Sequence, residues 1–330
     1  MSRWRPYPGV TGRSAQLLRF LSCYRCLSSE AKRKTGVKLA SRERRVNVKK
    51  ILATHGLSPS KQRGQNFLVN RRYADGIVAA STCGAEDTVI EAGVGLGILT
   101  CALAPRVKNV IGVEIDGGLI EYHRLARILP ENVELIHGDI LTVDYQLLSS
   151  RFGRLKIVSN LPYSISHPFL FTIVDHAHCI EQVTVLLQKE VAERLKASVG
   201  TKLYGISTVL LNQVAVVEKL FTIRPEAFHP RPKVDSTLVR LTIRPQLLGK
   251  DEHAQLCRIV RGAFATRRKT LVNNLAALAG TSTIGHGSTK EVIKQCLSSI
   301  GIVVDVRAEQ LTIDQFIALK VQLSQAGYPL

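Results

Sequence analysis

The sequence lacks any uninterrupted stretch of about 20 apolar residues, the length that a membrane-spanning helix requires. The longest candidate, Ala92 to Ala104, is short, rich in glycine and preceded by Glu91. No membrane span is therefore expected, although 45% of the residues are hydrophobic. The length of 330 residues allows a full-sized core and, at roughly 150 residues per domain, predicts two domains.

The sequence also lacks the paired cysteines of a disulfide framework. The seven cysteines are odd in number, and most stand singly in segments typical of core or helix. This usage is typical of a reducing compartment. Cys23 and Cys26 resemble half of a zinc site, but no second pair follows at finger spacing, and His137, His167 and His229 have no metal-ligand spacing. We therefore expect no metal site.

Acidic residues are absent from positions 1–29, which hold five Arg and five Ser. The segment from Arg13 to Leu27 predicts a short amphipathic helix with leucines on one side, which is typical of an organellar transit peptide and unlike a secretory signal. Ser28 after Arg25 resembles a mitochondrial processing site. We expect the mitochondrial matrix as the location, with the plastid second because serine is frequent. A disordered tail that binds RNA is the alternative.

The formal net charge of +19 is distributed unevenly. Residues 1–50 hold nine Arg and five Lys but only two Glu, so they carry 12 of the excess positive charges and leave +7 on the rest. Such a surplus favours a polyanionic partner, but the body alone is too weakly basic to establish one. Lys32 to Lys50 is expected to be a linker, or a helix that forms on RNA.

The body alternates short β-branched runs with helical patterns, which favours βαβ units and a mostly parallel sheet. The expected strands are Thr88–Ile90, Asn109–Val113, Val133–Ile136, Lys156–Val158, Val183–Leu187, Glu218–Ile223 and Ser236–Ile243. After Pro245 the pattern is helical, over Glu252–Ala265, Thr270–Ala279, Lys290–Ser298 and Ile313–Ser324. We therefore expect a leader and linker at 1–50, an α/β domain at 51–245 and a smaller helical domain at 246–330.

A glycine-rich loop, Gly93 to Gly97, follows the first of these strands and opens a helix, as in folds that bind nucleotides. NAD-binding proteins use a similar loop, so the motif alone is weak. Glu91 precedes the loop, Glu114 ends the second strand in position to accept from two ribose hydroxyls, and Asp139 ends the third, where it suits an adenine amino group. Acids at consecutive strand ends indicate a nucleoside site at the edge of an open α/β sheet.

The fourth strand ends in Asn160-Leu161-Pro162-Tyr163. The Asn160 side-chain oxygen and the Leu161 carbonyl can accept both N–H bonds of an adenine amino group, which localises its lone pair toward an electrophile without a strong base. Pro162 holds Leu161 extended, and Tyr163 offers a face for stacking a flipped base. In isolation these residues would be an ordinary turn, but after a nucleoside-binding half-sheet they favour chemistry on an adenine.

With these motifs in place, the chain resembles the ribosomal RNA small-subunit adenine N(6)-dimethyltransferase family, in particular its mitochondrial-type members. The resemblance covers about residues 55 to 328, and Val94 stands where the family usually has proline. The matching segments are Gly64–Leu68, Gln188–Arg194, Ala227–Ser236, Phe264–Asn274 and Arg307–Leu311.

The resemblance implies the Rossmann-like α/β fold of a class I methyltransferase, with a smaller helical domain at the C-terminus. It also implies S-adenosyl-L-methionine as the cofactor. It implies a monomer that dimethylates two adjacent adenosines in the 3′-terminal hairpin loop of small-subunit ribosomal RNA, in support of organellar ribosome biogenesis. The expected partner is this RNA or the immature small ribosomal subunit. The expected cofactor contacts are Asn66, Leu68, Gly93, Gly95, Glu114, Asp139, Ile140 and Asn160. The expected catalytic residues are Asn160, Leu161, Pro162, Tyr163 and Phe228.

The resemblance implies that Phe228 supplies the second aromatic of the adenine pocket, and its polar neighbours favour this over a core position. The alternative is that Phe228 anchors its loop to the core. Arg267, Arg268 and Lys269 fall between two predicted helices and are expected to bind RNA phosphates, although charged runs are usually just solvated. Two other functions stay open. Mitochondrial relatives can act as transcription factors that bind nucleic acid and polymerase, with or without methyltransferase activity. An NAD-dependent oxidoreductase would leave Asn160 to Tyr163 unexplained.

Overall fold

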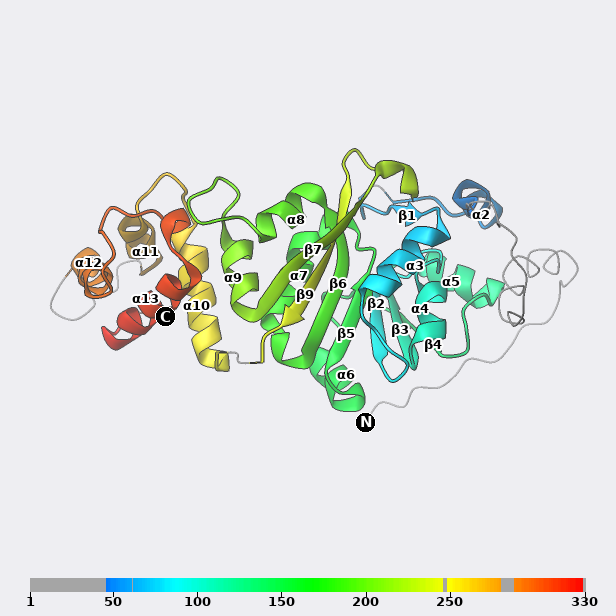
Figure 1. The fold of residues 1–330 in the computed structure, drawn as a ribbon, viewed down its shortest axis with the longest axis horizontal. Helices are drawn as coiled ribbons and strands as arrows, with labels where there is room; N and C mark the ends of the chain where they lie inside the picture. Colours follow the sequence, from blue (N-terminus) through cyan, green and yellow to red (C-terminus); the bar gives the residue numbers. More distant parts are fainter. Residues whose placement is uncertain (1–45, 61, 246–247, 280–287, 329–330) are drawn as a thin grey trace, which may run out of the picture.

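A computed structural model describes residues 46–60, 62–245, 248–279 and 288–328 of the chain. The predicted transit peptide and its processing site lie outside these described residues. In Figure 1 the molecule is elongated, with the sheet in the middle and the C-terminal helices at one end. No helix within the described ranges is both long and apolar enough to span a membrane.

The centre of the molecule is a seven-stranded sheet with the order β4-β3-β2-β5-β6-β9-β7. Strands β4 to β6 in this order are parallel, and β9 lies antiparallel between β6 and β7. The predicted strands are confirmed as β2 (Thr88–Ala92), β3 (Asn109–Glu114), β4 (Val133–His137), β5 (Leu155–Ser159), β6 (Ile180–Gln188), β7 (Ala215–Ile223) and β9 (Ser236–Ile243). The expected mostly parallel α/β fold is therefore confirmed.

Both faces of the sheet are covered, which explains why its strands are so apolar. Val89 and Val158 pack on one face with residues of α3 and α4, whereas their neighbours Ile90 and Ile157 pack on the other with α6, α7 and α9. The helices around the sheet are α3 (Arg71–Ala80), α4 (Thr100–Leu103), α5 (Gly117–Ala126), α6 (Tyr145–Phe152), α7 (Ser166–Asp175), α8 (Lys189–Leu195) and α9 (Ile206–Val214). Short 3₁₀ turns occupy Ala104–Arg106, Tyr163–Ile165, Ala177–Cys179, Pro225–Ala227 and Ala308–Gln310.

The four predicted C-terminal helices are present, and in Figure 1 they lie beyond α9 at one end of the molecule. They are α10 (Lys250–Ala263), α11 (Leu271–Ala279), α12 (Thr289–Ser299) and α13 (Ile313–Gln325). Their buried residues, such as Leu256, Leu275 and Phe316, belong to the same apolar cluster as the α7 and α9 side of the sheet. Of the four, α10 and α13 contact α9. The helical part therefore shares a continuous core with the α/β part.

Residues 46–50 belong to the body of the protein, contrary to the predicted boundary. Helix α2 (Val48–Thr54) starts within the expected linker, and Asn47 caps it by accepting from the Lys50 N–H at 3.0 Å. Val48 is buried, and the Val46 N–H donates to the Val69 carbonyl. The prediction of a linker through Lys50 is therefore wrong for residues 46–50, where two apolar residues anchor a basic segment on the body.

A second, two-stranded sheet was not predicted. Strand β1 (Phe67–Leu68) pairs antiparallel with β8 (Phe228–His229), so that Leu68 lies opposite Phe228. This pairing fixes the segment before α3 against the loop between β7 and β9. It thereby places residues 62–68 beside the carboxyl ends of the parallel strands, where the candidate site lies.

Candidate active site

A cavity of about 300 Å³ opens at the carboxyl ends of β2, β3, β4 and β5. The ends meet there because the strands are parallel and in register: Ala92 pairs with Val113, and Glu114 pairs with His137. The cavity is lined by all eight residues that the sequence predicted for the cofactor, namely Asn66, Leu68, Gly93, Gly95, Glu114, Asp139, Ile140 and Asn160.

The glycine loop lies directly against this cavity. Gly93 and Gly95 have φ values of 78° and 56°, a left-handed conformation that favours glycine. A β-carbon on Gly95 would stand 3.1 Å from the Phe67 ring, so a side chain there would also press on β1. His123, buried on α5, has a ring nitrogen 2.8 Å from the Gly95 carbonyl and holds the loop from behind. The Phe67 ring on one side and the His123 ring on the other therefore fix the conformation of the loop.

Glu114 is held at the end of β3 by backbone donors. Its Oε2 accepts from the Gly95 N–H and its Oε1 from the Asp116 N–H, both at 2.9 Å. Burial raises the pKa of Glu114, and these two donors partly offset that effect. Since each carboxylate oxygen has a second lone pair, Glu114 remains able to accept from a pair of hydroxyls.

Asp139 is held in a similar way at the end of β4. Its Oδ1 accepts from the Leu141 N–H at 2.9 Å, and its carbonyl accepts from the Thr142 hydroxyl. Its neighbour Ile140 is buried, and the Ile140 carbonyl accepts from the buried Tyr145 hydroxyl at 2.9 Å. The turn is therefore fixed, while the second Asp139 oxygen has no donor among the described residues.

Glu91 is the most unusual group in the cavity wall. Its side chain is fully buried, and neither carboxylate oxygen has a hydrogen-bond partner within the described ranges. Burial raises the pKa of Glu91 to about 8. The nearby Thr100 lowers this pKa by a smaller amount, and the negative charge of Glu114 raises it. A buried acceptor without a donor is costly unless a ligand supplies one, so Glu91 is suited to a cationic or N–H group in the cavity.

Asn160 has its amide oriented by a neighbour. Its Nδ2 donates to the Asn66 carbonyl at 2.8 Å, and the Asn66 side chain in turn donates to the Gly64 carbonyl. No donor from the described part of the chain reaches Asn160 Oδ1, so this oxygen is the half of the amide left for a ligand. Next to it, the Ser159 hydroxyl donates to the Ala92 carbonyl at 2.6 Å and locks β5 to β2.

The segment that carries Arg63 and Gln65 also lines the cavity, which motif reasoning did not foresee. The Ser164 hydroxyl donates to the Arg63 carbonyl, and Gln65 and Arg63 both reach the Asp116 carboxylate, at 3.1 and 2.6 Å. The match at Gly64–Leu68 was the available signal, but only Asn66 and Leu68 were assigned from it. These contacts place the segment beside the glycine loop and the end of β5.

Only some of the residues expected to face the target base line the cavity. Pro162 lines the cavity, whereas Leu161, Tyr163 and Phe228 do not. Leu161 is buried, and Tyr163 is half-buried with its hydroxyl paired to that of Ser236. Burial raises the pKa of Tyr163.

Phe228 corrects a prediction made from the sequence. Its side chain is only 4% exposed and belongs to the apolar cluster formed with α3, together with Ile77 and Ile223. The expectation that it is not a core residue is therefore wrong. Its polar neighbours are misleading because the β1–β8 pair turns Phe228 inward while His229 stays half-exposed.

The predicted RNA-binding residues lie in the loop between α10 and α11, and all three are exposed. Arg267 nevertheless has protein partners: it donates to the Lys202 and Thr201 carbonyls and lies 3.8 Å from a Glu309 oxygen. No side-chain partner within the described ranges holds Arg268 or Lys269. Only these two cations are therefore fully available to a polyanion.

The chain is similar to known ribosomal RNA methyltransferases over most of its length. The family model described as ribosomal RNA adenine dimethylase matches residues 57–319. A relative from Desulfotalea psychrophila, named ribosomal RNA small subunit methyltransferase A, is 42% identical over 83% of this chain and 94% of its own. A protein of the same name from Caldanaerobacter subterraneus is 41% identical over 79% of this chain and 95% of its own.

Solved structures agree with this result. A dimethyladenosine transferase from Plasmodium falciparum is 25% identical and superposes with a TM-score of 0.66, over 79% of this chain and 98% of that chain. The 23S rRNA methyltransferase ErmE shares the fold, with a TM-score of 0.56. The chain therefore belongs to the ribosomal RNA adenine dimethylase family, a family of methyltransferases, as its motifs predicted.

Proposed function

We propose that this protein transfers two methyl groups from S-adenosyl-L-methionine to the exocyclic amino nitrogen of each of two adjacent adenosines in the 3′-terminal hairpin loop of small-subunit ribosomal RNA. The observation that carries the proposal is the orientation of Asn160, whose Nδ2 is engaged by the Asn66 carbonyl and whose Oδ1 is left open at the cavity. An adenine amino group needs a hydrogen-bond acceptor at this position. An asparagine that served only to form a turn would not need a partner that fixes the orientation of its side-chain amide.

The cavity fits the proposed cofactor. Glu114 has acceptor capacity for two ribose hydroxyls, and the second oxygen of Asp139 can accept from an adenine amino group. The unpaired Glu91 carboxylate can accept from the cationic amino-acid end. When bound, S-adenosyl-L-methionine supplies an electrophilic methyl group on a sulfonium.

The residues of this chain then act mainly by positioning. Asn160 Oδ1 accepts one N–H of the target amino group. The Leu161 carbonyl, which receives no donor from the described residues, is proposed to accept the other; because Leu161 is buried and only its neighbours Asn160 and Pro162 line the cavity, this contact requires the target base to enter between them. Holding both N–H bonds directs the nitrogen lone pair toward the methyl group, which favours in-line attack without a strong base. Pro162 restricts Leu161 to an extended backbone and keeps its carbonyl in place.

The test is methylation of small-subunit ribosomal RNA. Purified protein with labelled S-adenosyl-L-methionine should label this RNA, and primer extension should stop at two adjacent adenosines only when the protein is present. Labelling at any other base, or binding of NAD instead of S-adenosyl-L-methionine, would contradict the proposal. Size-exclusion chromatography tests the accompanying expectation that the protein acts as a monomer.

We further propose that the protein serves a mitochondrial ribosome and works in the matrix. The support is the Arg-rich, acid-free stretch at 1–29. Trp4 is the only tryptophan and Met1 the only methionine, so cleavage near Leu27 leaves a mature protein without either. Import into isolated mitochondria should give a shortened product without tryptophan fluorescence, whereas a full-length cytosolic product would refute this location.

A further inference from the structure

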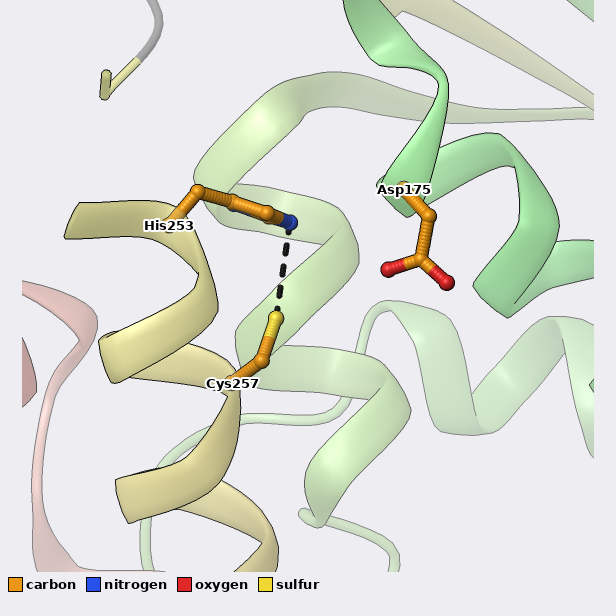
Figure 2. A group of neighbouring side chains, drawn as sticks. All are labelled: Asp175, His253 and Cys257. Atoms are coloured by element: carbon orange, nitrogen blue, oxygen red, sulfur yellow. Dashed lines mark hydrogen bonds between the residues drawn. The ribbon is translucent and has the colours of Figure 1, made fainter. Parts of the chain in front are cut away.

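A group of three metal-ligating side chains lies far from the cofactor cavity, where the helical part meets the α/β part. The side chains are Asp175, the last residue of α7, and His253 and Cys257 on α10. Figure 2 shows the three pointing into one space between the two helices. One ligand atom of each lies within 4.8 Å of the others. Nothing in the methyl-transfer chemistry uses them.

The geometry of the group matches a tetrahedral zinc site. His253 and Cys257 are four residues apart, so they share one face of α10. Cys257 Sγ lies 3.4 Å from His253 Nε2, close to the separation of about 3.5 Å that sulfur and nitrogen ligands of one tetrahedral zinc have. Asp175 is exposed at the end of its helix, so its carboxylate can move the remaining distance.

The helices that carry these residues are held in register by a second contact. Phe171 lies one turn before Asp175 on α7, and Arg261 lies one turn after Cys257 on α10. The Arg261 guanidinium lies over the Phe171 ring, with 5.4 Å between the guanidinium carbon and the ring centroid. The two contacts together show that α7 and α10 run antiparallel here. Asp175 is therefore held opposite His253 and Cys257 by the packing of the helices.

The chemistry of the donor set also favours zinc. A thiolate, an imidazole and a carboxylate are ligands that zinc commonly combines, and the two anions neutralise its double charge. His176, next in sequence, does not join them, because its ring stacks on Tyr145 at 4.9 Å. Arg261 is the nearby cation, and its guanidinium lies over the Phe171 ring, one helical turn away from the ligands.

We propose that Asp175, His253 and Cys257 bind one zinc ion, with water as the fourth ligand, and that this ion clamps α10 to α7. Without metal, the Cys257 thiol keeps its proton and can donate to His253, and burial raises the pKa of this thiol to about 11. Zinc binding displaces that proton to solvent and forms the Zn–S bond. Local spacing relates only His253 to Cys257, because Asp175 is 78 positions away from His253.

Metal titration of the full chain tests the proposal. All variants carry Cys23→Ser and Cys26→Ser, so that the leader thiols cannot bind the metal. Cobalt(II) serves as a spectroscopic substitute for zinc, since a thiolate-to-cobalt charge-transfer band reports sulfur coordination. We expect one equivalent of cobalt with this band, displacement by zinc, and a higher Tm with zinc than with chelator.

Three variants separate the zinc site from a simple thiol–imidazole hydrogen bond. Cys257→Ser should lose the charge-transfer band and the zinc-dependent Tm shift, whereas Cys296→Ser, which removes another buried thiol of the helical part, should keep both. Asp175→Asn changes an exposed residue and should weaken zinc binding about tenfold or more without unfolding the protein.

The reference protein is the chain that carries only Cys23→Ser and Cys26→Ser. The proposal is overturned if this protein binds no cobalt, or if the charge-transfer band and the zinc-dependent Tm shift persist after Cys257→Ser. Unchanged zinc affinity in Asp175→Asn overturns it too. Should Cys257→Ser fail to fold, the reference protein and Asp175→Asn still decide the matter.

Discussion

The residues predicted to hold the cofactor and those predicted to hold the RNA differ in how the fold treats them. Every predicted cofactor residue lines the cavity, and the acids among them are held by backbone N–H groups that leave acceptor capacity unused. Of the residues predicted to face the target base or to bind RNA phosphates, Asn160 and Pro162 also line the cavity. By contrast, Phe228 is core, Tyr163 is paired with Ser236, and Arg267 bonds to two carbonyls. Of the three predicted phosphate contacts, Arg268 and Lys269 have no side-chain partner among the described residues.

The difference follows from what positions each set. Glu114, Asp139 and Asn160 stand at or just after the ends of parallel strands, and the sheet alone aligns those ends. Aromatic and cationic residues in loops have no such constraint, so the fold can use them for packing and for bonds to distant carbonyls. A motif at a strand end is therefore stronger grounds for a functional role than the same residue types in a loop.

The largest effect is expected at Phe228. Phe228→Ala removes a buried ring from the cluster beneath α3, which costs about 3–5 kcal/mol of unfolding free energy. Phe221→Ala, at a half-buried ring on the same cluster, should cost less. Thermal unfolding of both variants measures this. If Phe228→Ala unfolds like the wild type but has lost methyl transfer, Phe228 is part of the adenine pocket. The contrast between the cofactor residues and the residues that face the base would then be wrong.

Asn160→Ala should give the next largest effect, on rate instead of stability. Loss of one positioned acceptor for the target amino group is expected to lower methyl transfer about 10²–10³-fold. Asn109→Ala, at the opposite end of a sheet strand, should leave the rate within a few-fold of wild type. Labelled methyl transfer to small-subunit RNA, read with the Tm, tests both. A near-normal rate for Asn160→Ala would remove this residue from the mechanism.

Glu114 should affect cofactor affinity. Glu114→Ala loses charge-assisted hydrogen bonds to two hydroxyls, each worth about 1.5–3 kcal/mol, and frees the Gly95 N–H that shapes the loop. Glu114→Gln keeps one acceptor oxygen and should lose less. Glu121→Ala, on the exposed surface of α5, is the matched control. Calorimetry with S-adenosyl-L-methionine should rank their dissociation constants in that order, and an unchanged value for Glu114→Ala would contradict the assignment.

The sequence predicted the large sheet and the C-terminal helices well, because long apolar runs and helical periods survive in a single chain. It missed β1 and β8 because two-residue strands have no period to detect. It missed the start of α2 because Val48 is surrounded by basic residues. These omissions share a cause, since each element is stabilised by contacts with parts of the chain that are distant in sequence.

The same limit separates the two halves of the predicted site. The strand-end acids could be placed because each follows its own strand. The partners of Arg267 are Lys202, Thr201 and Glu309, dozens of residues away, and no local pattern indicates them. Asp175 likewise joins His253 and Cys257 only through tertiary packing, because α7 and α10 both pack against α9.

The smallest expected effect distinguishes Arg268 from Arg267. If Arg268 contacts a phosphate, Arg268→Ala should reduce the slope of log affinity against log salt by about 0.7–0.9 and leave the Tm unchanged. Arg267→Ala should change that slope less and lower the Tm, because its guanidinium ties the loop at Thr201 and Lys202 to the start of α11. RNA binding measured over a range of salt concentrations, with thermal unfolding of each variant, separates the two residues. A full slope change at Arg267 with an unaltered Tm would show that its protein contacts yield to RNA, and the distinction between tied and free cations would not hold.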